Sequence, residues 1–184
     1  MMFLLNRNLH KFNWRIIGNI IGHVLLIEGF LLFLPLIVNM IYQESVAMAY
    51  ILTIILCILL GFPLSRLKTK HTSYFAKDGM IAVGLSWIVI SLFGALPFFF
   101  SKEIPSFIDC FFETVSGFTT TGSSILTDVE ALSHASLFWR SFTHWVGGMG
   151  ILVFLLAIVP RSNERTMHIM RAEAPGPVIG KLVP

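Results

Sequence analysis

The sequence has few charged residues and few cysteines. Asp, Glu, Lys and Arg make up 12% of its 184 residues, and the two cysteines are Cys57 and Cys110. Because soluble domains carry about 25% charged residues, this scarcity argues against a soluble protein. Two cysteines provide neither a disulfide framework nor a metal site, and Cys57, inside an apolar stretch, is predicted to be a packing residue.

Familiar catalytic patterns are also missing. The sequence contains no GxSxG motif, no HExxH motif and no paired histidine ligands. A membrane enzyme needs a nucleophile–base pair or a metal cluster, so we predict that the protein is not an enzyme and has no cofactor. The net charge of +3 reflects an uneven distribution of Lys and Arg between loops, and it gives no reason to expect nucleic-acid binding.

Long apolar runs dominate the chain. Hydrophobic residues account for 55% of it, and the mean hydropathy is +0.80. About 20 apolar residues in a helix cross the hydrocarbon core of a bilayer. Four stretches have roughly this length: residues 16–41, 47–64, 79–100 and 142–160. The sequence therefore predicts four membrane-spanning helices.

Basic residues indicate the orientation of these spans. Lys and Arg gather before the first span, between the second and third, and after the fourth, whereas residues 101–141 hold two basic and five acidic residues. Cytoplasmic loops are enriched in Lys and Arg, so both ends of the chain are predicted to be cytoplasmic. Four acids of the outer segment are interpreted as ordinary exposed residues that could also concentrate cations: Asp109, Glu113, Asp128 and Glu130.

A short helix is predicted inside the outer segment, at about residues 105–117. Ser106 can act as its N-cap, with Asp109 three residues later, and aromatic residues recur at helical spacing. Twelve residues give roughly 18 Å, about half a bilayer, so such a half-helix can enter from outside and end near the membrane centre. Its C-terminal end carries a partial negative charge that faces the next residues.

The next residues, 118–124, read FTTTGSS. Irregular backbone is tolerated in a membrane only where it is buried in protein or lines a watery path, and carbonyl groups on such a path can replace the water around a cation. We predict an extended filter strand in which Gly122 adopts a positive φ. An ordinary Ser/Thr-rich outer loop is the alternative, but the flanking spans and the half-helix favour the pore.

Three motifs resemble those of a known family. They are residues 118–123 (FTTTGS), 138–151 (FWRSFTHWVGGMGI) and 170–177 (MRAEAPGP). Together they resemble the membrane subunit of Trk/Ktr-type potassium uptake systems, which are superfamily relatives of potassium channels. The resemblance implies an all-α membrane protein with two N-terminal transmembrane helices plus one helix–pore-loop–helix repeat of a potassium-channel-like pore.

The resemblance also implies an organisation. Residues 1–72 would hold a cytoplasmic segment and two peripheral helices, residues 73–160 the first repeat, and residues 161–184 a cytoplasmic connection to a further repeat. Family members carry four repeats around one pore, so this chain would supply one quarter of the filter. We therefore expect an N-terminal fragment of a longer protein. The alternatives are a homotetrameric cation channel and a non-transporting accessory membrane protein.

The same resemblance implies a ligand and partners. Potassium would be the transported substrate, without any other metal, and its predicted ligands are Thr119, Thr120, Thr121, Gly122 and Ser123. The expected partners are the remaining pore repeats, a cytosolic nucleotide-binding regulatory subunit and, at full length, a second copy in a homodimer. The expected location is the bacterial inner membrane.

Other residues within the spans have structural interpretations. Glu28 lies in the first span, where an ionisable group is costly, and is predicted to have a partner in another helix. The glycines of residues 147–150 can permit close helix packing or form a hinge, and we favour packing. Four residues are expected to anchor the last span at the membrane interface: Trp139, Arg140, His144 and Trp145.

Overall fold

The computed structural model describes residues 14–67 and 76–158, and every regular element in these ranges is a helix. The helices are α1 (Trp14–Leu31), α2 (Phe33–Tyr42), α3 (Ala47–Ser65), α4 (Ala76–Gly94), α5 (Leu96–Ser101), α6 (Phe107–Phe118) and α7 (His134–Ile158). The all-α prediction is confirmed.

Three apolar stretches in the described ranges are long enough to cross a membrane. They are Trp14–Tyr42, which joins α1 and α2, Ala47–Ser65, which is α3, and Ile81–Ser101, which joins most of α4 to α5. The first three predicted spans are therefore confirmed.

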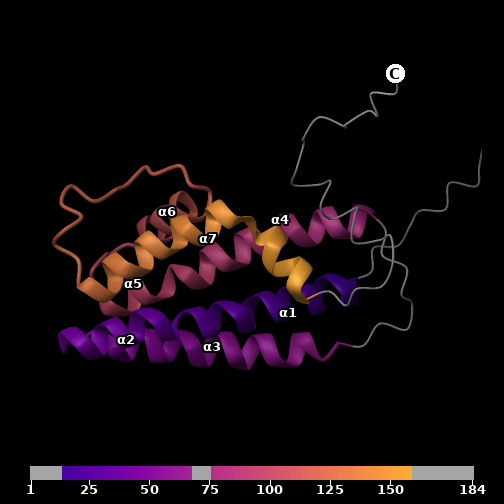
Figure 1. Ribbon diagram of the computed structural model, residues 1–184, viewed down its shortest axis with the longest axis horizontal. Coiled ribbons are helices and arrows are strands. Elements are labelled where there is room, and N and C mark those ends of the chain that lie inside the picture. The colour runs from indigo at the N-terminus through magenta and orange to yellow at the C-terminus, as the bar shows by residue number, and fades with distance from the viewer. Residues whose placement is uncertain (1–13, 68–75, 159–184) are drawn as a thin grey trace, which may run out of the picture.

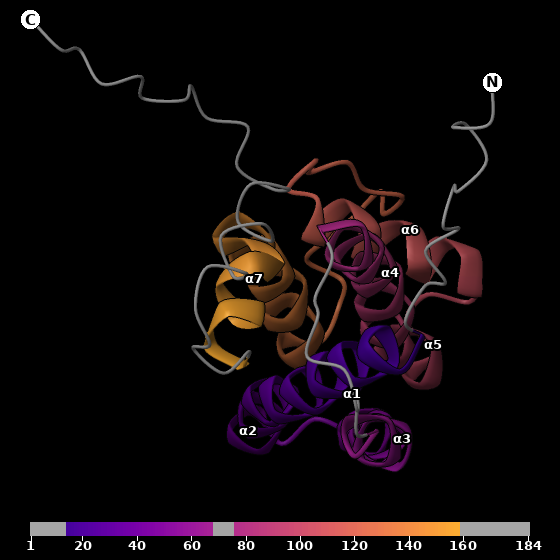
Figure 2. The same ribbon diagram turned by 90° about the vertical axis from the view of Figure 1, so that its right-hand side faces the viewer.

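The two N-terminal spans form one side of the molecule. In Figure 1, α1 and α2 follow one another alongside α3, and α4 to α7 lie above them. The end-on view of Figure 2 shows that α1 lies between α3 and the group formed by α4, α6 and α7. Accordingly, α1 packs against both α3 and α4, and α6 packs against both α4 and α7. The half-helix thus lies between two longer helices, α4 and α7.

Backbone contact brings α1 and α3 close together. A methyl group at Gly22 would lie 2.3 Å from the Ser65 backbone nitrogen and 2.8 Å from the Gly61 carbonyl oxygen. Small residues allow this approach between membrane helices. Cys57 on α3 is fully buried, which confirms its predicted packing role.

The fourth predicted span, residues 142–160, differs from the structure. Its helix α7 begins already at His134 and is interrupted at Gly150, whose φ of 72° and ψ of 141° are not helical. Residues 159 and 160 lie outside the described ranges. Close packing is confirmed at Gly147, where a methyl group would lie 2.1 Å from the Phe118 carbonyl oxygen. The glycine-rich stretch therefore combines a close contact with a break in the helix.

Two glutamates hold the N-terminal end of α7. The Glu44 carboxylate, between α2 and α3, accepts hydrogen bonds from the backbone N–H groups of His134 at 2.7 Å and Ala135 at 3.1 Å. Glu103, between α5 and α6, accepts one from the Ser133 N–H at 2.7 Å. Free N–H groups at a helix start favour carboxylates. The two connections are thereby fastened to α7.

Candidate functional site

The predicted half-helix is present as α6. It has 12 residues, from Phe107 to Phe118, and Ser106 is its N-cap, with a side chain that accepts a hydrogen bond from the Asp109 N–H at 3.5 Å. Its bounds differ from the predicted 105–117 by two residues at the start and one at the end. A length of roughly 18 Å follows from the rise of an α-helix, so α6 is too short to cross a bilayer.

Four consecutive backbone N–H groups after α6 turn back towards its last carbonyls. The acceptors are Val115 for Thr119, Gly117 for Thr120, and Ser116 for both Thr121 and Gly122, at 2.9–3.5 Å. Within the described part of the chain, the carbonyl oxygens of these four residues accept no hydrogen bond. Residues 119–124 are all exposed. The segment therefore directs its donors inward and leaves a row of acceptors available.

Two residues of this segment have left-handed backbone conformations. Gly122 has φ = 76° and Thr120 has φ = 56°. The predicted positive φ of Gly122 is confirmed. A methyl group at Gly122 would meet no atom within 4 Å, so the backbone conformation alone favours glycine there. Thr120 is β-branched, and its φ is unusual for such a residue. Strained backbone of this kind concentrates at functional sites.

The prediction of an extended strand from residue 118 is wrong for its first three residues. Phe118 still belongs to α6, and Thr119 keeps φ = −83° and ψ = 0°. The Thr119 N–H and hydroxyl group both donate to the Val115 carbonyl oxygen, at 2.9 and 2.7 Å, which prolongs the helical turn. The chain then turns at Thr120 and is irregular from Thr121 to Ser124.

Ser116 ties the far end of the segment to the half-helix. Its hydroxyl group donates to the Ser123 carbonyl oxygen at 2.5 Å. A carbonyl oxygen has two lone pairs, so this bond leaves one lone pair of Ser123 available. The binding of potassium by Thr119, Thr120, Thr121, Gly122 and Ser123 stays a prediction.

Glu113 is a buried residue of the candidate site that the sequence places wrongly. The sequence favours an exposed acid at the pore mouth, but the side chain is only 1% exposed and pairs with Arg140, whose Nε lies 2.5 Å from Glu113 Oε1. The carboxylate also accepts from the Ser124 hydroxyl group at 3.0 Å and from the Ile125 N–H at 3.2 Å. Glu113 thus links α6, the exit of the irregular segment and α7. A sequence signal existed, because Glu113 stands within the apolar half-helix.

The predicted interfacial anchors separate into two groups. The predicted anchoring role is wrong for Arg140, since its side chain is mostly buried and pairs with Glu113. It is also wrong for Trp139, which is 1% exposed and whose Nε1 donates to the Gly94 carbonyl oxygen at 2.9 Å. Trp145 is 56% exposed, as an anchor requires. His144 is half-buried, and its Nδ1 lies 2.9 Å from the Arg140 carbonyl oxygen.

These features define a class of membrane protein. A half-helix packs between α4, which is part of a candidate span, and the long helix α7. The exposed, irregular segment after it has backbone carbonyl groups without hydrogen bonds among the described residues, as in helix–pore-loop–helix proteins. Residues 43–182 match the model of the TrkH family, described as a cation transport protein. The chain belongs to this family, as the sequence resemblance predicted. The motif at residues 170–177 lies outside the described ranges.

Curated relatives and a solved structure agree with this assignment. The chain is 37% identical over 171 residues to the Trk system potassium uptake protein TrkH of Salmonella typhimurium, covering 90% of this chain and 35% of the relative. It is 36% identical over 168 residues to that of Escherichia coli K12. The crystal structure of the potassium transporter TrkH from Vibrio parahaemolyticus is similar with a TM-score of 0.71 and 30% identity, over 87% of this chain and 36% of that one. The chain therefore spans about a third of these relatives' length.

Proposed function

We propose that this chain is part of the translocation subunit of a potassium uptake protein and contributes one quarter of a carbonyl-lined selectivity filter. The relatives are named as potassium uptake proteins, and the family is described as cation transporting. The proposal includes a multi-pass location in a bacterial inner membrane, as the family resemblance implies, and the positions of the basic residues support cytoplasmic ends.

One observation carries the proposal. The N–H groups of Thr119, Thr120, Thr121 and Gly122 are all bonded to α6 carbonyls, so the opposite side of this backbone presents carbonyl oxygens. Oxygens of this kind replace the hydration shell of potassium in channel filters. The C-terminal end of α6, with its partial negative charge, lies directly behind them and favours a cation.

A complete ring of oxygens needs further segments of the same kind. In this proposal they come from the remaining pore repeats of the full-length protein, which also pairs with a second copy and with a cytosolic nucleotide-binding regulatory subunit. The domain boundaries at residues 72 and 160 belong to the same proposal. The exposure of residues 119–124 supports it, because this face is open to such additional walls.

The proposal is tested by Gly122→Ala in the complete protein. The added methyl group meets no neighbouring atom within 4 Å, so the substitution acts through φ alone, and a left-handed conformation costs a residue with a Cβ roughly 1–2 kcal/mol. Potassium uptake by a potassium-uptake-deficient host should fall about tenfold, and sodium should inhibit growth at low potassium more strongly, because the carbonyls lose their alignment.

Gly84→Ala is the matched control. A methyl group at Gly84, on α4, also meets nothing within 4 Å, and its φ is not left-handed. Uptake and selectivity should therefore remain those of the unaltered protein. If Gly122→Ala behaved like Gly84→Ala at equal expression, residues 119–123 would not line the ion path.

A further inference from the structure

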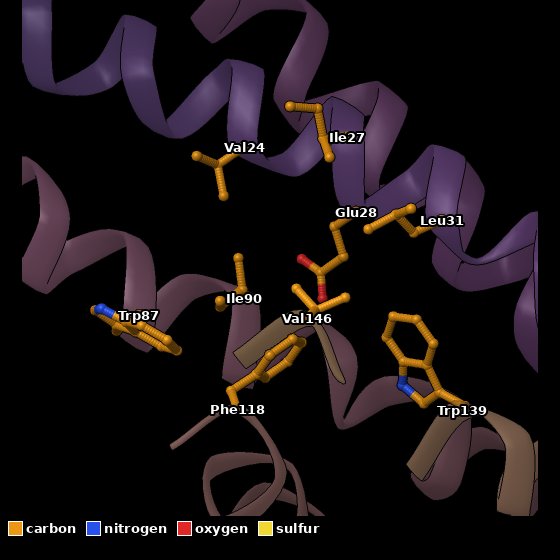
Figure 3. A pocket seen from close by; sticks show the side chains of 9 residues that line it. All are labelled: Val24, Ile27, Glu28, Leu31, Trp87, Ile90, Phe118, Trp139 and Val146. Atoms are coloured by element: carbon orange, nitrogen blue, oxygen red, sulfur yellow. The ribbon is translucent and has the colours of Figure 1, made fainter. Parts of the chain in front are cut away.

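Glu28 is a carboxyl group inside α1 whose oxygens have no partner in the described residues. The residue is 3% exposed, and both of its carboxyl oxygens are buried without a hydrogen bond there. The partner predicted in another helix is therefore not found among these residues. Figure 3 shows that the side chain points away from α1 towards Val146, Phe118 and Trp139.

The Glu28 carboxyl group faces a small cavity between α1, α4, the end of α6 and α7. Its volume is about 30 Å³, and eight other residues line it: Val24, Ile27, Leu31, Trp87, Ile90, Phe118, Trp139 and Val146. The Trp139 indole N–H already donates to the Gly94 carbonyl oxygen. A cavity of roughly 10–15 Å³ holds one water molecule when two or more polar partners are present. The lining is almost entirely apolar and both Glu28 oxygens are fully covered by protein atoms, so this requirement is not met and the carboxyl group gains no water partner here.

An ionised Glu28 is unfavourable in this setting. Moving an unpaired carboxylate out of water costs several kcal/mol even after the protein relaxes, and the described residues that line this cavity include no cationic side chain. A bound metal cation is equally unfavourable, because hard cations take six or more oxygen ligands and the carboxyl group supplies two. A proton removes the charge, so the neutral carboxyl group is the form that suits these surroundings.

We propose that Glu28 is a proton-binding site whose carboxyl group is kept neutral by its apolar, unpartnered position beside this cavity. From α3, the thiol of Cys57 interacts electrostatically with Glu28, and the Cys57 Cβ would lie 3.0 Å from a methyl group at Gly29, the residue after Glu28. From α4, α6 and α7 only apolar and tryptophan side chains line the cavity. Among the described side chains of these elements, none that lines the cavity is charged and could hold an ionised form.

The site is in contact with the base of the candidate filter. A methyl group at Gly94 would lie 3.2 Å from Glu28 Oε1 and 3.1 Å from the Phe118 ring, and Phe118 immediately precedes Thr119. The proton therefore keeps a negative charge away from the start of the filter segment. This consequence rests on the proposed function, whereas the proton site itself is testable without any transport measurement.

The first test is infrared spectroscopy of the complete protein at pH 7. The carbonyl stretch of a protonated carboxyl group should be present, should vanish in Glu28→Gln, and should persist in Glu130→Gln, which alters an exposed acid. An identical protonated-carboxyl band in Glu28→Gln and the unaltered protein would overturn the proposal, even if potassium uptake were normal.

The second test is thermal stability. Because Gln is a neutral isostere of a protonated Glu, the midpoint of Glu28→Gln should lie within about 5 °C of that of the unaltered protein. A larger fall indicates that Glu28 is ionised and paired with a cation from elsewhere in the complete protein, since breaking a buried ion pair is strongly destabilising. That result would also overturn the proposal.

Discussion

The pair formed by Glu113 and Arg140 joins three parts of the candidate site. Glu113 lies on α6 and contacts the exit of the irregular segment through Ser124 and Ile125, while Arg140 extends from α7. Hydrogen bonds to an ionised acceptor are roughly twice as strong as neutral ones. The carboxylate therefore fixes where the segment leaves the half-helix, and so positions the carbonyls of the preceding residues.

We predict that Glu113→Gln lowers the stability of the complete protein by about 3 kcal/mol, because removing one partner of a buried ion pair leaves the other uncompensated. Potassium selectivity should also fall in Glu113→Gln, because the carboxylate positions the carbonyls of the irregular segment. Thermal unfolding in detergent and uptake with and without sodium are the measurements. Arg140→Met combined with Glu113→Gln should recover part of the loss, while Glu130→Gln should change neither property. If the stability lost in the double variant equalled the sum of the stabilities lost in the two single variants, Glu113 and Arg140 would not be coupled.

Glu44 makes the attachment of α7 sensitive to pH. Burial raises the pKa of this carboxyl group, but hydrogen bonds from His134 and Ala135 outweigh it and hold the pKa below its ordinary value of 4.5. A lowered folded pKa stabilises the protein fully above pH 4.5, and this contribution is lost as pH falls through the folded value.

We therefore predict that the thermal midpoint falls below pH 4.5 in the unaltered protein. In Glu44→Gln the midpoint should be lower at pH 7 and should change less over the same acid range. Thermal unfolding between pH 3 and pH 7 measures both. The same acid dependence in Glu44→Gln would assign the effect to another carboxyl group.

At the scale of elements, local signals were sufficient to predict much of the site. The half-helix could be predicted from the Ser106 cap and the apolar spacing. The positive φ of Gly122 could be predicted from the conformational freedom of glycine. The turn at Thr120 could not be predicted, because it depends on hydrogen bonds back to Gly117 and Ser116. The pairing of Glu113 with Arg140 could not be predicted either, since sequence alone does not give the register between α6 and α7.

Close contact between α1 and α3 supports a graded prediction at the same scale. A methyl group at Gly22 would lie 2.3 Å from a backbone atom, one at Gly18 would lie 3.0 Å from the flexible Leu67 side chain, and one at Gly84 would meet nothing within 4 Å. Overpacking lowers stability by about 1–3 kcal/mol. Where there is room for the methyl group, alanine instead stabilises a helix relative to glycine by about 1 kcal/mol.

The thermal midpoint should therefore fall most in Gly22→Ala, less in Gly18→Ala and not at all in Gly84→Ala. Measurement of all three variants in one detergent removes differences in the surroundings. If Gly22→Ala were as stable as Gly84→Ala, the backbones of α1 and α3 would not be in contact in the protein.

For the whole molecule, the exposed face of residues 119–124 is the feature that most needs an explanation. Unsatisfied backbone groups facing hydrocarbon cost several kcal/mol each, yet this face is polar and its carbonyls are open. In the proposed assembly, neighbouring repeats cover it and a row of potassium ions and water occupies the centre. In that assembly, a single chain would supply one quarter of the ligands that a desolvated potassium ion requires.

We predict that residues 1–184 alone insert into membranes but do not conduct potassium. After reconstitution, potassium flux should equal that of empty liposomes, because one segment cannot replace the hydration shell of the ion. The positive control is the complete protein, reconstituted at the same protein density. It should give potassium flux, and the Gly122→Ala substitution should reduce that flux. Potassium-selective flux from the 184-residue chain, together with a stable tetrameric mass in detergent, would replace the proposed fragment with a homotetrameric channel.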